Sequence, residues 1–157
     1  MIRSLERSDK AGVMSILERT AMFTPGEIAV AEEVMDACLD RPEQNDYEAV
    51  VFEDGERSLA GYAAFGPTPL TEGTYDLYWI AVAPERQGAG VGRRLMEWVE
   101  DRLRQSGGRL LLIETSSQSR YEPTRRFYLG LGYREAARIA GFYKPGDDRV
   151  IYAKYFG

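Results

Sequence analysis

The sequence predicts an α+β fold built around a mixed β-sheet. Strand-like and helical patterns follow one another in the order β-α-α-β-β-β-α-β-α-β-β, which sets helices among groups of strands. Two strand-like runs flank Asp54-Gly55, a dipeptide typical of the turn in an antiparallel hairpin. In the middle of the chain a strand-like run leads into a glycine-rich loop and then into a helical run. Together these patterns favour one sheet with helices packed against it.

Composition is that of one globular domain. The chain has 157 residues, of which 44% are hydrophobic and 29% charged, enough for a single domain over residues 1–157 and too few for two ordinary ones. No apolar stretch approaches the ~20 residues of a membrane span, and residues 1–7 lack the apolar core of a signal peptide. The single cysteine, Cys38, excludes an internal disulfide. We therefore expect a cytoplasmic protein without membrane contact.

Charge and histidine content narrow the chemistry. The formal net charge is −5, which disfavours nucleic acid as a partner and mildly favours a cation such as an amine. The chain contains no histidine, which removes Ser-His and Cys-His catalysis and the usual zinc ligands. Any proton transfer must therefore use carboxylate, tyrosine, lysine or water, and we expect no metal.

The first 40 residues predict a short strand and two helices. Residues 2–6 form the strand-like run, and Ser8 is placed to cap a helix that ends near Thr20. Residues 24–27, Thr-Pro-Gly-Glu, form a capping box with proline at the first helical position and open the second helix. The expected inward side chains are Val13, Ile16 and Leu17 in the first helix and Ile28, Ala31, Val34, Met35, Cys38 and Leu39 in the second.

The remaining elements follow from alternation and periodicity. Residues 47–53 and 59–65 alternate as the two hairpin strands, and residues 75–82 form the strand before the glycine-rich loop. A helix over about residues 90–105 is closed by Gly107-Gly108. The last elements are a buried strand over 110–115, a helix around Tyr128, a strand after Gly132 and a strand over 150–155.

The most informative segment is Gln87-Gly88-Ala89-Gly90-Val91-Gly92, which lies between a strand and a helix. Backbone N–H groups at a helix N-terminus attract anions, and glycine allows a phosphate to approach the backbone closely. The segment therefore predicts a phosphate-bearing ligand. The structural alternative is an ordinary glycine-rich turn before a helix.

Two common phosphate-binding loops do not fit this segment. A P-loop needs Gly-Lys-Ser/Thr, whereas Gly92 is followed by Arg93-Arg94. A dinucleotide-binding loop needs G-x-G-x-x-G after an early strand and an acidic residue about 20 residues later. The segment instead has G-x-G-x-G more than halfway along the chain, which opposes a nucleotide-binding oxidoreductase.

A third loop pattern, Gln/Arg-x-x-Gly-x-Gly, fits residues 87–92. A second motif, residues 124–133 with the sequence Thr-Arg-Arg-Phe-Tyr-Leu-Gly-Leu-Gly-Tyr, is similar to Ala-x-x-Phe-Tyr-x-x-x-Gly-Phe. In order and spacing the two motifs resemble those of the GCN5-related N-acetyltransferases, well over residues 46–157 and more loosely before. The resemblance implies a central, mostly antiparallel sheet of six to seven strands flanked by about four helices, and acetyl-CoA as co-substrate.

The resemblance also implies where acetyl-CoA binds. The loop amides, the helix dipole and one arginine would hold the pyrophosphate. The pantetheine arm would enter between the strands that precede and follow the glycine-loop helix, where a backbone N–H also faces the thioester oxygen as charge develops. Arg125 or Arg126 is the candidate for the ribose phosphate. The cofactor-binding candidates are Ile80, Ala81, Val82, Gln87, Gly88, Ala89, Gly90, Val91, Gly92, Arg93 and Arg126.

The implied reaction is attack of a primary amine on the acetyl thioester, which needs a base for the ammonium proton and an acid for the leaving thiolate. Glu114 matches the glutamate of the ribosomal-protein N-terminal acetyltransferases in the family, and Asp76 aligns with the glutamate of the histone acetyltransferases. Tyr128 matches the family's acid tyrosine. The structural alternatives are a solvent-facing charge for Asp76, a cap or salt bridge for Glu114 and a core tyrosine for Tyr128. Water is a further candidate for the base.

The acceptor side departs from the family pattern and leaves the acceptor open. Tyr121 stands where the family often has an asparagine that bonds pantetheine, and Pro123 delays the following helix. The acceptor is a small-molecule or peptide amine: amino acid, polyamine, aminoglycoside or protein N-terminus. Residues 141–148 are interpreted as a loop that serves as a substrate lip or a homodimer contact. The acceptor-binding candidates are Phe23, Glu27, Tyr78, Trp79, Phe142, Tyr143 and Asp147, of which Glu27 also serves its capping box.

Two other interpretations use the same fold. A non-catalytic acyl-CoA sensor would keep the loop and lose the base and the acid, so the presence of Glu114 and Tyr128 disfavours it. A protein-interaction module would use a sheet edge and the aromatic tail and would not need the loop over residues 87–92.

Overall fold

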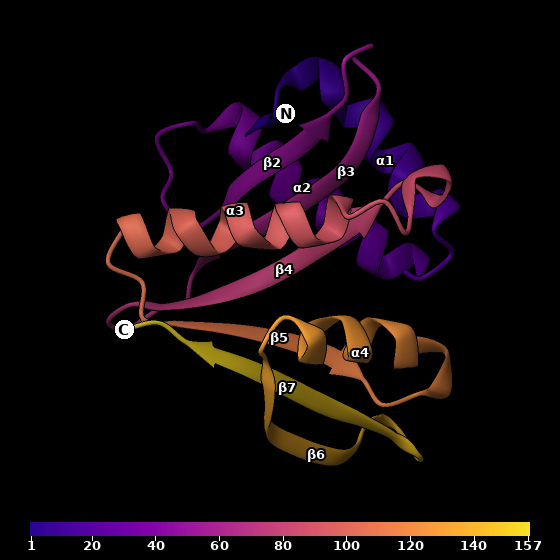
Figure 1. The fold of residues 1–157 in the computed structure, drawn as a ribbon, viewed down its shortest axis with the longest axis vertical. Coiled ribbons are helices and arrows are strands. Elements are labelled where there is room, and N and C mark those ends of the chain that lie inside the picture. Colours follow the sequence, from indigo (N-terminus) through magenta and orange to yellow (C-terminus); the bar gives the residue numbers. More distant parts are fainter.

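Seven strands form one sheet in the order β1-β2-β3-β4-β5-β7-β6. Neighbouring strands are antiparallel except β4 and β5, which are parallel. The computed structural model describes residues 1–157 and confirms a mixed, mostly antiparallel sheet with four helices (Figure 1). The strands are β1 (Ile2–Ser4), β2 (Glu48–Glu53), β3 (Leu59–Pro67), β4 (Thr74–Val82), β5 (Leu110–Ser116), β6 (Arg134–Lys144) and β7 (Asp147–Tyr155). The helices are α1 (Lys10–Arg19), α2 (Pro25–Asp40), α3 (Val91–Gln105) and α4 (Glu122–Gly130), with 3₁₀ turns η1 (Arg7–Asp9), η2 (Pro84–Arg86) and η3 (Ser119–Tyr121).

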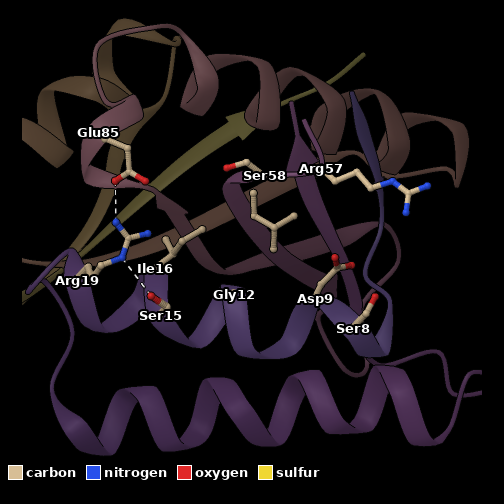
Figure 2. Close-up of a pocket in the computed structure, with 10 residues that line it drawn as sticks. Ser8, Asp9, Gly12, Ser15, Ile16, Arg19, Arg57, Ser58 and Glu85 are labelled. Atoms are coloured by element: carbon tan, nitrogen blue, oxygen red, sulfur yellow. Dashed lines mark hydrogen bonds and ion pairs between the residues drawn. The ribbon is translucent and has the colours of Figure 1, made fainter. Parts of the chain in front are cut away.

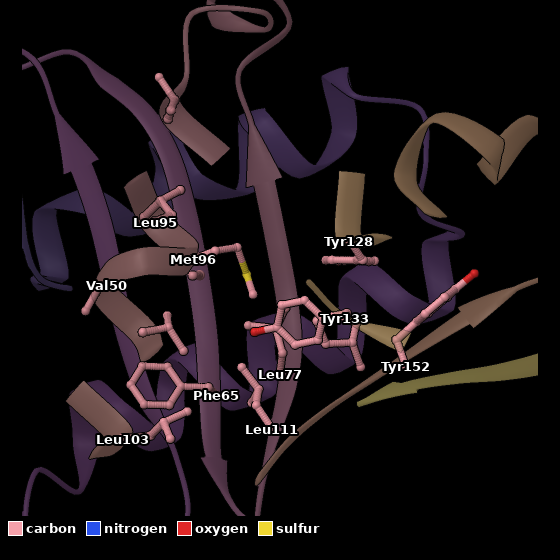
Figure 3. Close-up of a cluster of buried hydrophobic side chains, with 14 of the residues drawn as sticks. Val50, Phe65, Leu77, Leu95, Met96, Leu103, Leu111, Tyr128, Tyr133 and Tyr152 are labelled. Carbon is pink, nitrogen blue, oxygen red and sulfur yellow. The ribbon is translucent and has the colours of Figure 1, made fainter. Parts of the chain in front are cut away.

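The helices cover both faces of the sheet and bury two apolar cores. Helices α3 and α4 lie on one face and α1 and α2 on the other (Figure 1). In β2, Val50 and Phe52 join the first core while Ala49 and Val51 join the second, because successive strand residues point to opposite faces. Figure 3 shows the first core, in which side chains of α3, α4 and the middle strands pack together. None of the helices is both long enough and apolar enough to cross a bilayer.

The predicted start of α2 is confirmed and that of α1 is wrong. The Thr24 hydroxyl accepts a hydrogen bond from the Glu27 amide at 3.1 Å, and the Glu27 carboxylate accepts one from the Thr24 amide at 3.2 Å. Ser8, by contrast, lies inside η1 and does not cap α1. Asp9 occupies the N-cap position of α1 without a side-chain capping bond; its carboxylate accepts a hydrogen bond from the Glu6 amide at 2.8 Å, which closes the capping box of η1. The first strand ends accordingly at Ser4, two residues earlier than predicted.

The C-terminal run predicted as a loop is mostly strand. Strand β6 continues to Lys144 and β7 begins at Asp147, so only residues 145 and 146 form the turn between them. The glycine and proline content of residues 141–148 suggested a loop, but pairing of Lys144 with Asp147 closes a tight hairpin. The prediction of a loop over 141–148 is therefore corrected to a hairpin end.

Strands β4 and β5 pair over only four positions and then separate. The pairs run from Thr74↔Leu110 to Leu77↔Ile113. A β-bulge coincides with the separation, because β3 pairs with Leu77 and with Trp79 at successive positions, which leaves Tyr78 as an extra residue on β4. A bulge bends the strand that carries it. We call residues 78–82 of β4 and 114–116 of β5 the diverging segments; Figure 1 shows the two strands moving apart.

A buried charge network joins α3 to the C-terminal part of the sheet. Glu100 of α3 is only 6% exposed. Its carboxylate accepts hydrogen bonds from the Tyr133 hydroxyl at 2.7 Å and from the Lys154 ammonium at 3.0 and 3.2 Å. Lys154 also donates to the Leu131 carbonyl at 2.8 Å. The network therefore ties the helix that follows the glycine-rich loop to β7 and to the turn before β6.

Replacing Lys154 by methionine should leave Glu100 buried without its cation. We expect the free energy of unfolding to fall by about 2–3 kcal/mol, at or below the low end of the range for broken buried pairs, because the Lys154 side chain is 26% exposed. Urea unfolding measures this change. The matched control is Glu97→Gln, which removes an exposed partner 4.0 Å from Arg93 on the same helix and should cost less than about 0.5 kcal/mol. Equal losses in the two variants would contradict the role of the network.

Candidate functional site

The glycine-rich loop is anchored through η2, the turn that precedes it. Glu85 Oε2 lies 2.7 Å from Arg19 Nη1 of α1 (Figure 2), and Arg86 Nη1 lies 2.6 Å from Asp54 Oδ2 in the β2–β3 hairpin. Backbone amides of the hairpin turn, together with Arg86, lower the pKa of Asp54, so this pair stays charged at neutral pH. The shallow depression in Figure 2, of about 310 Å³, lies between α1 and this hairpin and contains none of the predicted site residues.

The backbone amides at the start of α3 are free. None of the N–H groups of residues 88–93 donates to another backbone group, and the first bond of the helix runs from the Arg94 amide to the Gly90 carbonyl at 3.1 Å. Gly88 and Gly90 have φ of +79° and +83°, conformations that cost an L side chain about 1–2 kcal/mol. A Cβ at either position would meet nothing within 4 Å. In the absence of a ligand, glycine is therefore favoured here by the left-handed backbone conformation and not by lack of space for a side chain. Such a row of amides is suited to an anion.

Close packing brings the loop next to α4. A Cβ added to Gly92 would lie 3.2 Å from the Phe127 ring, and one added to Gly61 would lie 2.8 Å from Leu95. The two glycines thus let the first turn of α3 lie against α4 on one side and β3 on the other. Because Phe127 precedes Tyr128, this contact also fixes how far Tyr128 lies from the loop.

Two amides in the diverging segment of β4 face the side that β5 has left. The Ala83 amide donates to the Ala60 carbonyl of β3 at 2.8 Å. Alternate residues of a strand direct their backbone groups to opposite edges. Ile80 and Val82 therefore point their N–H and C=O groups toward β5, where no strand pairs with them, whereas Ala81 points its groups toward β3. Of the three predicted backbone contacts, Ile80 and Val82 therefore have amides without a strand partner on the diverging side, while the Val82 carbonyl accepts a hydrogen bond from Gln87 Nε2 at 3.4 Å.

Tyr128 is a core residue with an available hydroxyl. It is 4% exposed, and its ring packs against Tyr133 and Tyr152 with centroid distances of 6.1 and 6.2 Å. Burial raises the pKa of Tyr128, so the hydroxyl keeps its proton at neutral pH. No group in the chain forms a hydrogen bond with that hydroxyl, and its oxygen is not completely buried. The hydroxyl can therefore donate to a ligand.

Glu114 begins the diverging segment of β5 and is held by donors from two other strands. The Tyr143 hydroxyl of β6 donates to Glu114 Oε2 at 2.5 Å, and Arg149 Nη2 of β7 lies 2.8 Å from Oε1. The Arg149 guanidinium stacks on the Phe142 ring at 5.1 Å. The salt bridge foreseen as the structural role of Glu114 is therefore present. Its side chain is nevertheless 43% exposed, so the carboxylate stays within reach of a ligand.

Asp76 lies before the point of separation. It is opposite Leu112, where β4 and β5 still pair, and its carboxylate accepts a hydrogen bond from the Thr68 hydroxyl at 2.7 Å. Because Leu112 and Glu114 are two residues apart on β5, Asp76 and Glu114 share a face of the sheet. The two candidate bases are thus on the same face, but only Glu114 lies in a diverging segment.

The predicted acceptor residues fall into two groups. Phe142, Tyr143 and Asp147 gather near Glu114; Asp147 is 6% exposed and accepts a hydrogen bond from the Ser116 hydroxyl at 2.5 Å. The other group lies on the N-terminal side of the sheet. There Phe23 and Trp79 pack against the second core, and Tyr78, whose burial raises its pKa to about 12, meets the ring of Tyr47 at 5.4 Å.

Tyr121 connects the two sides. Its hydroxyl donates to the Met22 carbonyl in the α1–α2 loop at 3.0 Å and accepts a hydrogen bond from Arg120 at 2.5 Å. The hydrogen bond to Tyr121 raises the pKa of Arg120. The residue that replaces the family's asparagine is therefore occupied in bridging η3 to the N-terminal helices.

The arginines expected near a phosphate differ in how many contacts their guanidinium groups make within the chain. Arg93 is exposed at the start of α3, and Arg126 is exposed with a single glutamate partner one turn earlier in α4, at 2.8 Å. Arg125 instead donates to the carbonyl of Ser116, the last residue of β5, at 2.9 Å and to that of Gln118 in the following loop at 2.8 Å, so its guanidinium is engaged within the chain. No group of three or more cysteine, aspartate or glutamate side chains is arranged to hold a metal ion.

Sequence reasoning missed Arg149 and Thr68. Side chains two residues apart in a strand point to the same face, so the sequence could have shown that Arg149 shares a face with Asp147. Its pairing with Ser116, which brings it beside Glu114, depends on a strand register that the sequence does not reveal. Thr68 follows β3, and only the β3–β4 pairing brings it to Asp76.

The comparisons with known proteins agree with this arrangement. The model of the acetyltransferase (GNAT) family matches residues 13–133. A GNAT-family protein from Desulfovibrio desulfuricans is 46% identical, with a TM-score of 0.93 over 99% of this chain and 98% of that one. The chain therefore belongs to the GNAT acetyltransferase family. No curated protein is significantly similar in sequence.

More distant structures share the fold. An aminoglycoside 6'-N-acetyltransferase complexed with coenzyme A is 19% identical, with a TM-score of 0.78 over 99% of this chain and 96% of that one. The ribosomal-protein-S18-alanine N-acetyltransferase from Escherichia coli is 23% identical, with a TM-score of 0.77 over 99% and 92%. At these identities the likeness concerns the fold alone.

Proposed function

We propose that the chain transfers an acetyl group from acetyl-CoA to a primary amine by direct attack in a ternary complex. The observation that carries the proposal is the pair of free backbone sets: the amides of residues 88–93 at the start of α3 and those of Ile80 and Val82 beside them. The first set suits a pyrophosphate and the second an amide-like arm. Acetyl-CoA supplies both groups, together with an activated acetyl group.

The chain's own residues divide the binding between them. The loop over residues 87–92 holds the pyrophosphate with backbone amides, and Arg93 adds a charge at the same helix end. Arg126, whose side chain is exposed, would contact a phosphate of the adenosine part. Ile80 and Val82 pair with the arm, and one of their N–H groups stabilises negative charge that develops on the acetyl oxygen.

Glu114 is the stronger candidate for the base. It lies in a diverging segment, its carboxylate is accessible, and Arg149 Nη2 holds one of its oxygens at 2.8 Å. It takes a proton from the acceptor ammonium, directly or through one water, so that the nitrogen lone pair is free to attack. Asp76 is the second candidate, because it shares the face but lies where the strands still pair.

Tyr128 is the candidate acid. Its pKa is raised by burial, so it carries a proton under working conditions and can deliver it to the leaving sulfur. No partner in the chain competes for that hydroxyl. The acceptor is a small-molecule or peptide amine that approaches the accessible carboxylate of Glu114.

A second candidate function is a protein-interaction module or dimer contact formed by the sheet edge. Every residue of the edge strand β6 is exposed, and an unpaired edge offers a row of donors and acceptors to another strand. Such a module would not require acetyl-CoA. A sensor that binds acyl-CoA without catalysis is the other alternative, and it would bind the ligand without releasing its thiol.

Replacing Gly90 by valine tests the loop. Calorimetric titration of the purified protein with acetyl-CoA should give micromolar binding, and NADH and ATP should give none. The valine variant should bind at least about 30-fold more weakly, which corresponds to about 2 kcal/mol, because the left-handed φ of +83° is lost or strained and the amides are misplaced. The midpoint temperature of thermal unfolding should fall only slightly. Unchanged affinity in a folded variant would refute the assignment of the loop.

Replacing Tyr128 by phenylalanine tests the acid. With any amine that supports thiol release, kcat should drop by about 10²-fold, within the range for a positioned acid, while affinity for acetyl-CoA stays near that of the wild type. The variant keeps the ring contacts with Tyr133 and Tyr152, so the fold should be retained. Wild-type turnover across the pH range would remove the proton-donor role.

A further inference from the structure

The end of strand β6 leaves the regular ladder just before Tyr143. Ile139 pairs with Arg149 and Lys144 pairs with Asp147, so residues 140–143 lie opposite Asp148 alone. A bulge of this kind redirects the side chains it carries. Gly141 supplies the left-handed backbone that the bulge needs, with φ of +62°.

Asp148 holds this bulge in place. Its carboxylate accepts hydrogen bonds from the Gly141 amide at 2.9 Å and from Arg138 Nη1 at 3.1 Å. These two donors, the amide first, lower the pKa of Asp148, so it remains charged near neutral pH. The carboxylate therefore stands in for the ladder bonds that the bulge has lost.

The bulge carries Phe142 and Tyr143 across β7 to β5. In the sheet β7 separates β6 from β5, yet the Tyr143 hydroxyl reaches Glu114 of β5 at 2.5 Å. Phe142 lies against the Arg149 guanidinium, and Arg149 binds the other oxygen of the same carboxylate. The rings of Phe142 and Tyr143 meet edge to face at 5.0 Å. The four side chains thus form a closed cycle around one accessible carboxylate.

We infer that Tyr143 is a positioning residue for Glu114, rather than an acceptor contact. Its hydroxyl fixes one carboxylate oxygen while Arg149 fixes the other, which sets the orientation in which Glu114 takes the acceptor's proton. In that step the ammonium N–H bond breaks, an O–H bond forms on Glu114 and the electron pair remains on nitrogen; Tyr143 keeps its own proton. The inference rests on the proposed function, because it gives Glu114 the role of base.

The charged and titratable groups around this pair are few. Tyr143 faces Glu114 from β6 and Arg149 faces it from β7, while Asp147 lies near Tyr143. Asp76 of β4 shares the face and makes no hydrogen bond to Glu114. Burial and then the hydrogen bond to Glu114 raise the pKa of Tyr143, so the phenol is the donor at neutral pH.

The contact itself can be tested without an acceptor. In protein labelled at tyrosine ¹³Cζ, the Tyr143 signal is assigned by its loss in Tyr143→Phe and followed by NMR from neutral to high pH. In Glu114→Gln the phenol should ionise at a lower pH than in the wild type, because a negative neighbour that opposes ionisation is gone. The same titration in both proteins would overturn the inference, because it would show that the phenol is not bound to Glu114.

The role in catalysis is tested with an amine that supports thiol release. Tyr143→Phe should lower kcat/KM at neutral pH about tenfold and move the acidic limb of its pH profile upward by about one pH unit, because a carboxylate that loses a donor holds its proton more tightly. Affinity for acetyl-CoA should not change. Tyr155→Phe is the matched control: Tyr155 is a 74% exposed tyrosine of β7, and its variant should behave as the wild type.

Two results would overturn the role. A raised KM for the acceptor with an unmoved pH profile would make Tyr143 an acceptor contact. The wild-type protein could instead transfer acetyl to none of the amines while the Tyr143 titration still differs between wild type and Glu114→Gln. That result would refute the proposed function and with it any catalytic role of Tyr143, and it would leave the Tyr143–Glu114 contact established.

Discussion

The separation of β4 from β5 is the constraint on which the rest of the molecule depends. Two parallel strands that stop pairing expose backbone donors and acceptors, which are costly to leave without partners away from water. Here the bulge at Tyr78 begins the separation, and Ile80 and Val82 keep free groups on that side. A ligand with amides of its own can satisfy these groups. The loss of pairing between β4 and β5 is thus also the feature that makes a binding site possible.

A sheet divided in this way needs support from outside the ladder. The buried carboxylate of Glu100 supplies it, because it binds Tyr133 and Lys154 from the C-terminal part. Contact between Gly92 and Phe127 joins the same two parts at the other end of α3. These links fix the loop amides, which belong to the N-terminal part, relative to Tyr128, which belongs to the C-terminal part. The proposed proton donor and the proposed phosphate site, on opposite sides of the separation, are thereby held at a fixed distance from each other.

The absence of histidine shapes the acid–base chemistry. A carboxylate and a phenol differ widely in basicity, and burial favours the neutral form of Tyr128. The proposed roles follow that difference, with the Glu114 carboxylate as proton acceptor and the Tyr128 phenol as proton donor.

The sequence by itself determined the order of elements, the α2 capping box and the glycine-rich loop, because each depends on residues that are close in the chain. It suggested roles for Glu114 and Tyr128 only through the family resemblance. Local patterns also misled: Ser8 does not cap α1, and residues 141–148 are mostly strand. Only the tertiary structure decided that Tyr143 and Arg149 meet Glu114 and that Asp76 remains in the paired part of β4. Those contacts depend on register and on a bulge, and a shift of one residue in strand pairing would turn each side chain to the other face.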